Sequence, residues 1–154
     1  MNYWLMKSEP DTFSIDDLAR EPGKTACWDG VRNYQARNYL RDGMKKGDLA
    51  FFYHSSCRVP GIAGIVTITR EGYPDPTAFD PNDDHYDPDS NPDKPRWYMV
   101  DVKLVKKLPR VITLEELRSY STKELRDLVL LRRGNRLSVM PVSKSEWEFI
   151  NSLA

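Results

Sequence analysis

The chain has 154 residues, of which 40% are hydrophobic and 30% charged, and it carries no net charge at neutral pH. This composition excludes a disordered chain, and no stretch approaches the roughly 20 consecutive apolar residues of a membrane span. The length predicts a single domain over residues 1–154. The N-terminus lacks a basic start, an apolar stretch and a small-residue cleavage site, so we expect a cytoplasmic protein without a secretory signal.

The zero net charge is the sum of unlike parts. Residues 71–93 contain eight Asp or Glu and no Lys or Arg, so the other residues together carry a formal charge of +8. We interpret the acidic segment as a solvated loop. The basic remainder is compatible with an anionic partner, although the sequence pI of about 6.7 makes strong non-specific binding to nucleic acid unexpected.

The N-terminal part of the chain alternates short apolar runs with helix signals. An aromatic run predicts a strand over residues 3–6. Ser14, followed three residues later by Asp17, has the spacing of a helix start, and a Glu-Pro-Gly sequence breaks that helix soon afterwards. A short strand is expected over residues 25–28, and Asn33 is placed to cap a second helix that runs to about residue 40.

The middle of the chain predicts three strands and one loop. Residues 49–54 are almost continuously apolar, which indicates a strand buried on both faces. Residues 61–69 are rich in β-branched side chains, and the two glycines among them indicate a bulge or a close approach of another backbone. Residues 72–95 hold six of the eleven prolines and predict an irregular acidic loop. Residues 96–108 alternate and predict a long strand.

The last third contains three capping-box signals and one further strand. The pairs Thr113/Glu116, Ser121/Glu124 and Ser143/Glu146 each predict a helix start. A strand is expected over residues 137–140, ended by Pro141. In total we expect about five strands and four short helices that do not alternate regularly. This order favours an α+β fold, a small curled β-barrel with helices packed on it, over a doubly wound parallel sheet.

Metal and cofactor motifs are missing from the sequence. Cys27, Cys57, His54 and His85 do not form any zinc-ligand spacing, and we expect two free thiols. The segment from Asp80 begins like a calcium loop but lacks the turn glycine and the closing glutamate. Since glycine-rich phosphate loops are also missing, we expect no metal and no cofactor. A Cys57–His54 pair is possible, but a partly buried thiol and a histidine with a local polar role are the simpler interpretation.

Aromatic, amide, hydroxyl and cationic side chains gather at the predicted ends of strands and helices, where a scaffold presents a binding site. These side chains supply what a planar base requires, namely a surface for stacking and groups that form hydrogen bonds with its edge. Trp28 has two interpretations on these grounds, as a core tryptophan or as the stacking surface.

Four segments together resemble the EVE domain family, and they are spread over nearly the whole chain: Tyr3–Pro10, Trp28–Asn38, Phe52–Ser55 and Arg136–Val142. The resemblance implies a PUA-like fold, a small curled β-barrel flanked by short helices, related to YTH and ASCH domains. It also implies a reader that binds modified bases in DNA or RNA, above all cytosines altered at C5.

The resemblance assigns roles to individual residues. Trp28 and the loop to Tyr34 would form an aromatic pocket, and Asn33 would contact the edge of the base. The other residues expected in the pocket are Lys7, Ser8 and Glu9 at its floor, Tyr53, His54 and Ser55 on another wall, and Ser138. Nucleic-acid contacts are expected from Arg32, Arg37 and Arg136. The family often has Gln where this chain has Met140, a difference that would alter base selectivity only if the side chain faces the pocket.

Three functional hypotheses follow. The first is a non-enzymatic, monomeric reader that extrudes a modified base from DNA or RNA. The second is a hydrolase acting on a modified nucleotide or RNA, with Glu9, Asp29 or His54 as acid or base. The third is a protein-interaction module whose acidic loop, residues 75–93, binds a basic partner.

Overall fold

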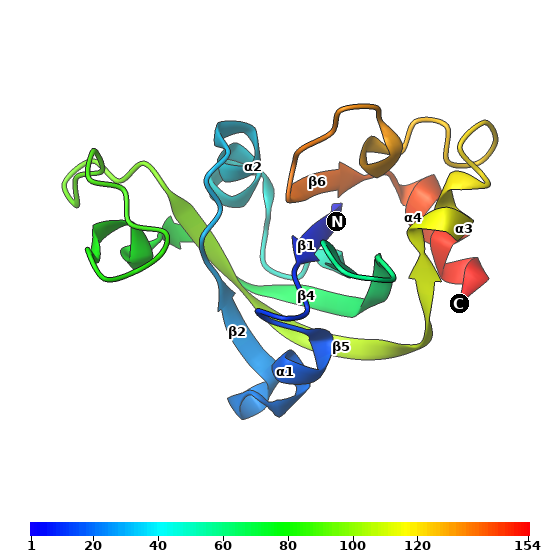
Figure 1. Cartoon of the computed structure of the whole chain (residues 1–154), viewed down its shortest axis with the longest axis horizontal. Coiled ribbons are helices and arrows are strands. Elements are labelled where there is room, and N and C mark those ends of the chain that lie inside the picture. The colour runs from blue at the N-terminus through cyan, green and yellow to red at the C-terminus, as the bar shows by residue number, and fades with distance from the viewer.

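Six strands form one mixed sheet in the computed structural model, which describes residues 1–154 (Figure 1). The strand order is β2-β5-β4-β3-β1-β6, in which β1 and β3 are parallel and all other neighbours are antiparallel. The strands are β1 (Tyr3–Ser8), β2 (Thr25–Trp28), β3 (Leu49–His54), β4 (Gly61–Pro74), β5 (Tyr98–Thr113) and β6 (Val139–Val142). Each apolar run that predicted a strand therefore belongs to one, and there are six strands rather than about five.

Four short α-helices accompany the sheet: α1 (Ile15–Arg20), α2 (Tyr34–Asn38), α3 (Leu114–Arg118) and α4 (Lys144–Leu153). Ser14 and Ser143 form the predicted capping boxes, and the side chains of Asn33 and Thr113 accept hydrogen bonds at the starts of α2 and α3. Helix α2 continues into a π-helical turn over Tyr39–Gly43. None of these helices is long and apolar enough to cross a membrane.

The sheet curls but does not close, so the expectation of a barrel is wrong. Strands β2 and β6 stand at the two ends of the strand order and share no ladder. Each has only four residues, which limits the hydrogen bonds that it contributes. The register of β4 against β5 shifts at several points, and such bulges increase the twist that curls the sheet. Strand β6 also continues through Pro141 to Val142, because an edge strand tolerates a proline.

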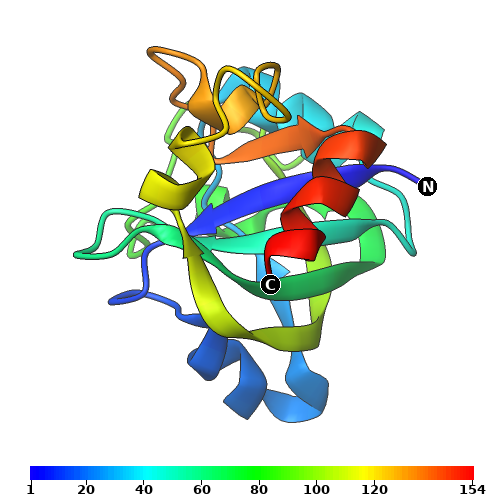
Figure 2. The same cartoon turned by 90° about the vertical axis from the view of Figure 1, so that its right-hand side faces the viewer.

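The sheet is buried on both faces, as the apolar pattern of β3 predicted. Ala50 and Phe52 belong to one core cluster, and the alternate residues Phe51 and Tyr53 belong to a second. Helix α4 covers the second cluster, because the Trp147 ring stacks on Phe51 at a centroid distance of 4.0 Å (Figure 2). The first cluster fills the inside of the curl and contains Trp28.

The capping-box signal at Ser121 does not start a helix. Residues 121–127 form successive turns, and the amides of Lys123 and Leu125 both donate to the Tyr120 carbonyl. Leu125 and Leu128 are fully buried in the second core cluster. A capping box contributes about 1 kcal/mol, so the packing of these two leucines outweighs it here.

Gly64 marks a close contact between α1 and the sheet, as its position within a strand predicted. A Cβ atom at Gly64 would overlap the Cδ1 atom of Ile15 and would lie 2.6 Å from the carbonyl oxygen of Lys106. The strand register also shifts between Ile62 and Gly64. The absence of a side chain here therefore lets α1 pack directly on β4 and β5.

Replacing Gly64 by alanine should lower the free energy of unfolding by about 1–3 kcal/mol, because the added methyl group overpacks this contact. Urea unfolding followed by circular dichroism measures the loss. The same substitution should cost less in an Ile15→Val background, which removes the overlapping Cδ1 atom, but the overlap with the Lys106 backbone would remain. A Gly64→Ala variant within about 0.5 kcal/mol of the parent would contradict the close contact.

Candidate functional site

A groove of about 1000 Å³ lies where the curled sheet stays open. Its walls come from the edge strand β2, from the end of β1, and from the segment that leads into β6. Loops 29–32 and 84–85 complete the rim. The residues predicted for the site that line this groove are Lys7, Ser8, Glu9, Trp28, Arg32, Ser55, Arg136 and Ser138. Segments that are far apart in the sequence thus meet at one hollow, and most of the predicted residues meet there with them.

Trp28 forms part of the groove and part of the core at once. It ends β2, keeps only 7% of its surface exposed, and packs edge-on against Phe52 at a centroid distance of 5.3 Å. It also lines the groove. The two interpretations of this tryptophan are therefore compatible, since one residue can fill the inner core and present a small aromatic surface to an occupant of the groove.

The loop after Trp28 is fixed by a buried carboxylate at the end of β4. Asp75 Oδ2 accepts hydrogen bonds from the Gly30 amide at 2.8 Å and from Arg32 Nη1 at 3.1 Å, while Oδ1 accepts from the amide and the hydroxyl of Thr77. Burial opposes ionisation of Asp75, but the bonds from Thr77, Gly30 and Arg32 outweigh it and lower the pKa of the carboxyl. Asp75 therefore holds the groove-lining loop 29–32 against residues 75–77.

Arg32 serves this same clamp rather than the solvent. Besides its bond to Asp75, its guanidinium donates to the His85 carbonyl at 2.7 Å and 3.0 Å and to the Thr77 hydroxyl at 3.1 Å. Its Cζ atom lies 5.4 Å from the centre of the Trp97 ring. Because these partners occupy its donors, we assign Arg32 to positioning the loop and no longer to contacting nucleic acid.

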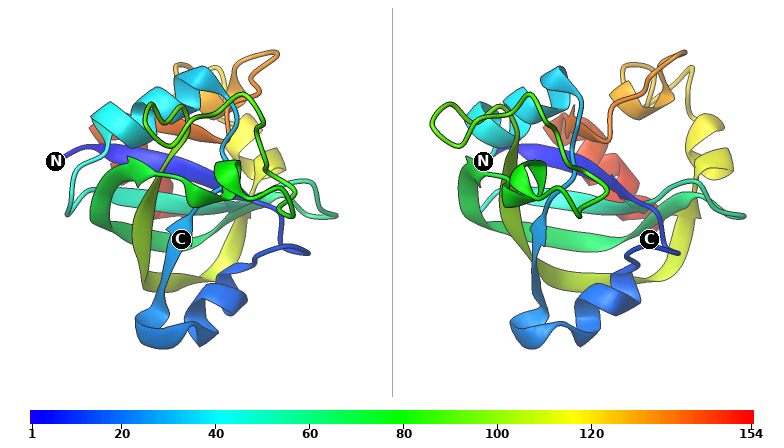
Figure 3. Two further views of the ribbon diagram at one scale, coloured as in Figure 1. Left: turned by 90° about the vertical axis from the view of Figure 1, so that its left-hand side faces the viewer. Right: turned by 60° about the vertical axis from the view of Figure 1, so that its left-hand side comes forward.

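The acidic segment is a packed loop, and its interpretation as a solvated excursion is wrong. It lies on the same side of the molecule as α2 (Figure 3). Several of its side chains bond the amide two residues further on, as Asp80 does to Asn82 and Asp83 does to His85. Such turns require acceptor side chains, which explains the abundance of Asp and Asn. The Trp97 indole also donates to Asp87 at 2.7 Å.

This loop brings two residues to the groove that the sequence did not identify, Asp84 and His85. Gly30 explains the fit: its φ is +77°, and a Cβ atom there would lie 2.7 Å from the His85 imidazole. Only glycine both adopts this backbone conformation without strain and leaves room for the ring. The one signal available in the sequence was the glycine itself, which follows Asp29 in a turn.

The groove contains both cations and carboxylates. Lys7 and Arg136 form no ion pair within the protein, and burial lowers the pKa of Lys7. Glu9 and Asp29 line the same groove. Desolvation and the nearby Asp75 carboxylate raise the pKa of Asp29. The arrangement can therefore accept hydrogen bonds from an amino edge and also pair with a negative group.

Three predicted residues lie outside the groove and have other partners. Asn33 caps α2 by accepting from the Ala36 amide at 3.0 Å. Tyr34 is 54% exposed and stacks on Trp97 at 5.0 Å. Arg37 lies over Tyr34, and its Nη1 donates to the Arg96 carbonyl at 2.7 Å. These contacts attach α2 to residues 96–97, so any contact of the three with a base stays a prediction.

Tyr53 and His54 also point away from the groove, at the end of β3. Tyr53 is buried in the second core cluster, and burial raises the pKa of its hydroxyl to about 12. His54 Nε2 accepts a hydrogen bond from the Ile15 amide at 3.1 Å, and burial lowers the pKa of its imidazole. A neutral histidine with an occupied Nε2 has the local polar role expected from the sequence. The hydrolase hypothesis thereby loses its histidine base.

Two further sequence questions are answered by burial. Met140 is fully buried in the second core cluster, so the residue that departs from the family pattern does not face the groove. Cys27 and Cys57 are free thiols, as expected. No group of three or more His, Cys, Asp or Glu side chains is arranged to hold a metal ion.

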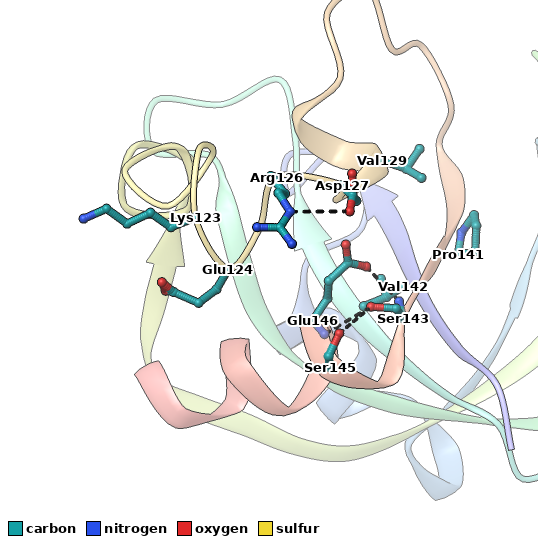
Figure 4. Close-up of a pocket in the computed structure, with 10 residues that line it drawn as sticks. All are labelled: Lys123, Glu124, Arg126, Asp127, Val129, Pro141, Val142, Ser143, Ser145 and Glu146. Carbon is teal, nitrogen blue, oxygen red and sulfur yellow. Dashed lines mark hydrogen bonds and ion pairs between the residues drawn. The ribbon is translucent and has the colours of Figure 1, made fainter.

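A second hollow, of about 820 Å³, lies beside the start of α4 and contains none of the predicted site residues (Figure 4). Its polar groups already bind one another: the Ser143 amide donates to Glu146, and Arg126 lies 3.9 Å from Asp127. It has no aromatic lining. The groove beside β2 is therefore the better candidate for a base.

An open, curled sheet with a mixed-charge groove at its edge defines a small α+β binding domain. A family model described as the EVE domain matches residues 2–153, and the chain belongs to that family. Human thymocyte nuclear protein 1 (THYN1) is 50% identical over 167 residues, covering 99% of this chain and 73% of the relative. A solved structure of human THYN1 in complex with DNA containing 5-methylcytosine is 49% identical, with a TM-score of 0.96 and coverage of 99% of this chain and 97% of that chain. A protein from Pseudomonas putida is 54% identical, with a TM-score of 0.93 and coverage of 98% of each chain.

Replacing Asp75 by asparagine should lower the free energy of unfolding by about 2–4 kcal/mol, because it leaves Arg32 and buried amides without an ionised acceptor. We place the loss below the full cost of a broken buried pair because the Arg32 side chain is 22% exposed. Chemical unfolding measures it. Asp80→Asn is the matched control, since its exposed turn survives on an amide oxygen. Equal losses in the two variants would contradict the clamp.

Replacing His54 by glutamine should reduce the loss of stability on acidification. Because burial lowers the pKa of His54 in the folded state, the unfolded chain binds a proton more readily. Stability is then complete above the unfolded value of about 6.5 and falls as the pH drops through the folded pKa. Thermal melts at pH 7.5 and pH 5 test this, and an unchanged difference between the two melts in His54→Gln would contradict it. The lowered pKa of Asp75 acts at lower pH and does not interfere.

Proposed function

We propose that this protein is a non-enzymatic reader of C5-modified cytosine, which binds DNA carrying 5-methylcytosine and holds the modified base in the groove beside β2. The observation that carries the proposal is the groove, which combines a buried tryptophan, hydrogen-bonding walls and two cations without internal partners. The complex of human THYN1 with DNA containing 5-methylcytosine supports the choice of ligand. RNA with the same modification is included in the proposal as a second substrate to be tested.

The energy balance of base extrusion favours a groove of this kind. Removing a base from a duplex costs a few kcal/mol, and stacking on an aromatic side chain returns about 1–3 kcal/mol. Trp28 and its apolar neighbours Phe13, Val31 and Leu137 provide the contact surface. Single-stranded or mismatched DNA should therefore bind more tightly than a matched duplex, because less pairing has to be broken.

Selection of the methyl group depends on apolar contact. Burying one methyl group contributes about 0.8 kcal/mol, which corresponds to roughly a fourfold preference over cytosine. A larger preference requires a pocket that excludes water from the unmodified base. We therefore expect modest discrimination at C5, increased by any part of the wall that closes on the methyl group.

Recognition of cytosine itself falls to the carboxylates of the groove. Asp and Glu accept hydrogen bonds from the N4 amino group of cytosine. Asp29 follows Trp28 directly and lines the same groove, so a base resting against Trp28 would present its edge within reach of Asp29. The hydroxyls of Ser55 and Ser138 have no side-chain partner within the protein and are free to bond the remaining edge atoms.

The groove favours binding over catalysis. Nucleophilic catalysis requires a nucleophile hydrogen-bonded to a base, and no such pair lines the groove, since the Ser8 hydroxyl donates to the Phe13 carbonyl. His54 is neutral and occupied by the Ile15 amide. Glu9 and Asp29 face the groove without a partner of this kind. We therefore assign these carboxylates to recognition.

Fluorescence anisotropy with matched oligonucleotides tests the proposal. Single strands and duplexes of DNA, and single strands of RNA, would carry cytosine, 5-methylcytosine, 5-hydroxymethylcytosine or N6-methyladenine at one position. We expect 5-methylcytosine DNA to bind at least roughly fourfold more tightly than unmodified DNA. Equal affinity for every base would overturn the proposal.

Variants of the groove identify where the base binds. Lys7→Gln and Asp29→Asn should each weaken binding of 5-methylcytosine DNA by roughly 5-fold to 100-fold, as expected for a lost specific contact. Trp28→Phe is preferred to alanine, because emptying a buried tryptophan site costs about 3–5 kcal/mol of stability. Lys123→Gln, in the hollow of Figure 4, is the control and should bind like the parent. Unchanged binding by all three groove variants would place the base elsewhere.

A further inference from the structure

A third hollow, of about 330 Å³, lies between α2 and the loop of residues 132–137. Gln35 and Tyr39 line it from the α2 side, and Arg132, Arg133 and Arg136 line it from the loop. No carboxylate lines this hollow. Its electrostatic character therefore differs from that of the groove beside β2, in which cations and carboxylates are mixed.

The three arginines of this hollow are the least satisfied group of cations in the protein. None of their side chains forms an ion pair or a hydrogen bond. Elsewhere arginines are paired, as Arg41 is with Asp42 and Arg110 is with Glu116. Like charges five residues apart or closer repel one another, and an anion in the hollow would relieve that repulsion.

The loop that carries the arginines is held in place rather than loose. The Asn135 side chain accepts from the Leu137 amide at 3.1 Å and donates to the buried Met140 sulfur at 3.7 Å. Gly134 turns the chain with a φ of +75°, and nothing lies within 4 Å of where its Cβ would be. The guanidinium groups are thus displayed from a fixed turn whose tip is open, which lowers the entropic cost of binding.

Arg136 joins this hollow to the groove beside β2, because it lines both. A strand whose modified base occupies the groove would pass Arg136 and reach Arg132 and Arg133 with its neighbouring phosphates. Guanidinium groups bind phosphate with paired hydrogen bonds, and amide and phenol groups such as those of Gln35 and Tyr39 commonly contact phosphate or sugar. The Gln35 amide donates to the Tyr39 hydroxyl at 3.2 Å, which leaves that hydroxyl free to donate.

We propose that the hollow between α2 and residues 132–137 binds the sugar-phosphate backbone of the nucleic-acid strand on one side of the base held in the groove. This inference rests on the proposed function and adds the path of the strand. It assigns to Arg132 and Arg133 an affinity that is independent of base modification, whereas the groove supplies selectivity.

The test compares Arg132→Gln/Arg133→Gln with Lys123→Gln/Arg126→Gln, a control that removes the same charge from the hollow of Figure 4. The first variant should bind 5-methylcytosine and cytosine single strands about equally less tightly, by roughly tenfold at low salt, so that their ratio is preserved. Its plot of log K against log salt concentration should be shallower by about 1.4, or 0.7 for each lost phosphate of a single strand. The control should bind like the parent.

Oligonucleotide length provides a second readout. Lengthening the DNA on one side of the modified base should increase the affinity of the parent, and this gain should be lost in Arg132→Gln/Arg133→Gln. Equal salt slopes in the variant and the control would overturn the inference while leaving the reader intact, provided that the parent still prefers 5-methylcytosine. Binding of a polyglutamate peptide as tight as that of DNA would also overturn it, because the hollow would then select any polyanion.

Discussion

The two edge strands of the sheet, β2 and β6, set the conditions for the rest of the structure. Each has four residues and pairs on one side only, so the curled sheet ends in two edges that share no ladder. An unpaired edge presents backbone donors and acceptors that need other partners. Here the opening is bordered by the end of β1, the 29–32 loop and the 84–85 loop, which together form the groove. The site thus occupies the place where a closed barrel would have had a further ladder.

The walls of this groove depend on a single carboxylate. Asp75 bonds Gly30 and Arg32 of one loop and Thr77 of another, and Arg32 in turn bonds the His85 carbonyl. A buried acceptor is satisfied best by several donors of fixed geometry, and backbone amides and a guanidinium provide them. The acidic segment therefore contributes to the architecture of the site. This arrangement also disfavours the interaction-module hypothesis, in which the carboxylates of residues 75–93 would be free for a partner.

The division between paired and unpaired cations separates architecture from recognition. Arg32, Arg37 and Arg96 are bound within the protein and hold the loops around α2 and residues 75–97. Lys7, Arg132, Arg133 and Arg136 have no internal partner and line hollows. With a formal net charge of zero, the protein has no strong general attraction for nucleic acid. Affinity must then come from a few local contacts, and this is compatible with a protein that distinguishes one modified base from its surroundings.

The sequence alone determined the positions of nearly all strands and helices and the family to which the chain belongs. Ser14, Asn33 and Ser143 cap helices as predicted, because a cap is formed by residues within one turn of each other. The alternation of apolar residues in β3 likewise requires only neighbouring positions. Most of the groove residues, including Trp28 and Ser138, were identified through the family resemblance and lie at one hollow.

Only the tertiary structure decided whether the sheet closes, which partner each charge takes, and which face each side chain occupies. Asp75 lies 43 residues from Arg32, and their pairing requires the register of β4 against β5 and of β5 against β2. The same long-range packing turned His54 toward Ile15, buried Tyr53 on the opposite face, and brought His85 to the groove. Local patterns specify backbone conformation because its energetics involve nearby residues, whereas ion pairs and cavities depend on residues that meet only after the sheet has formed.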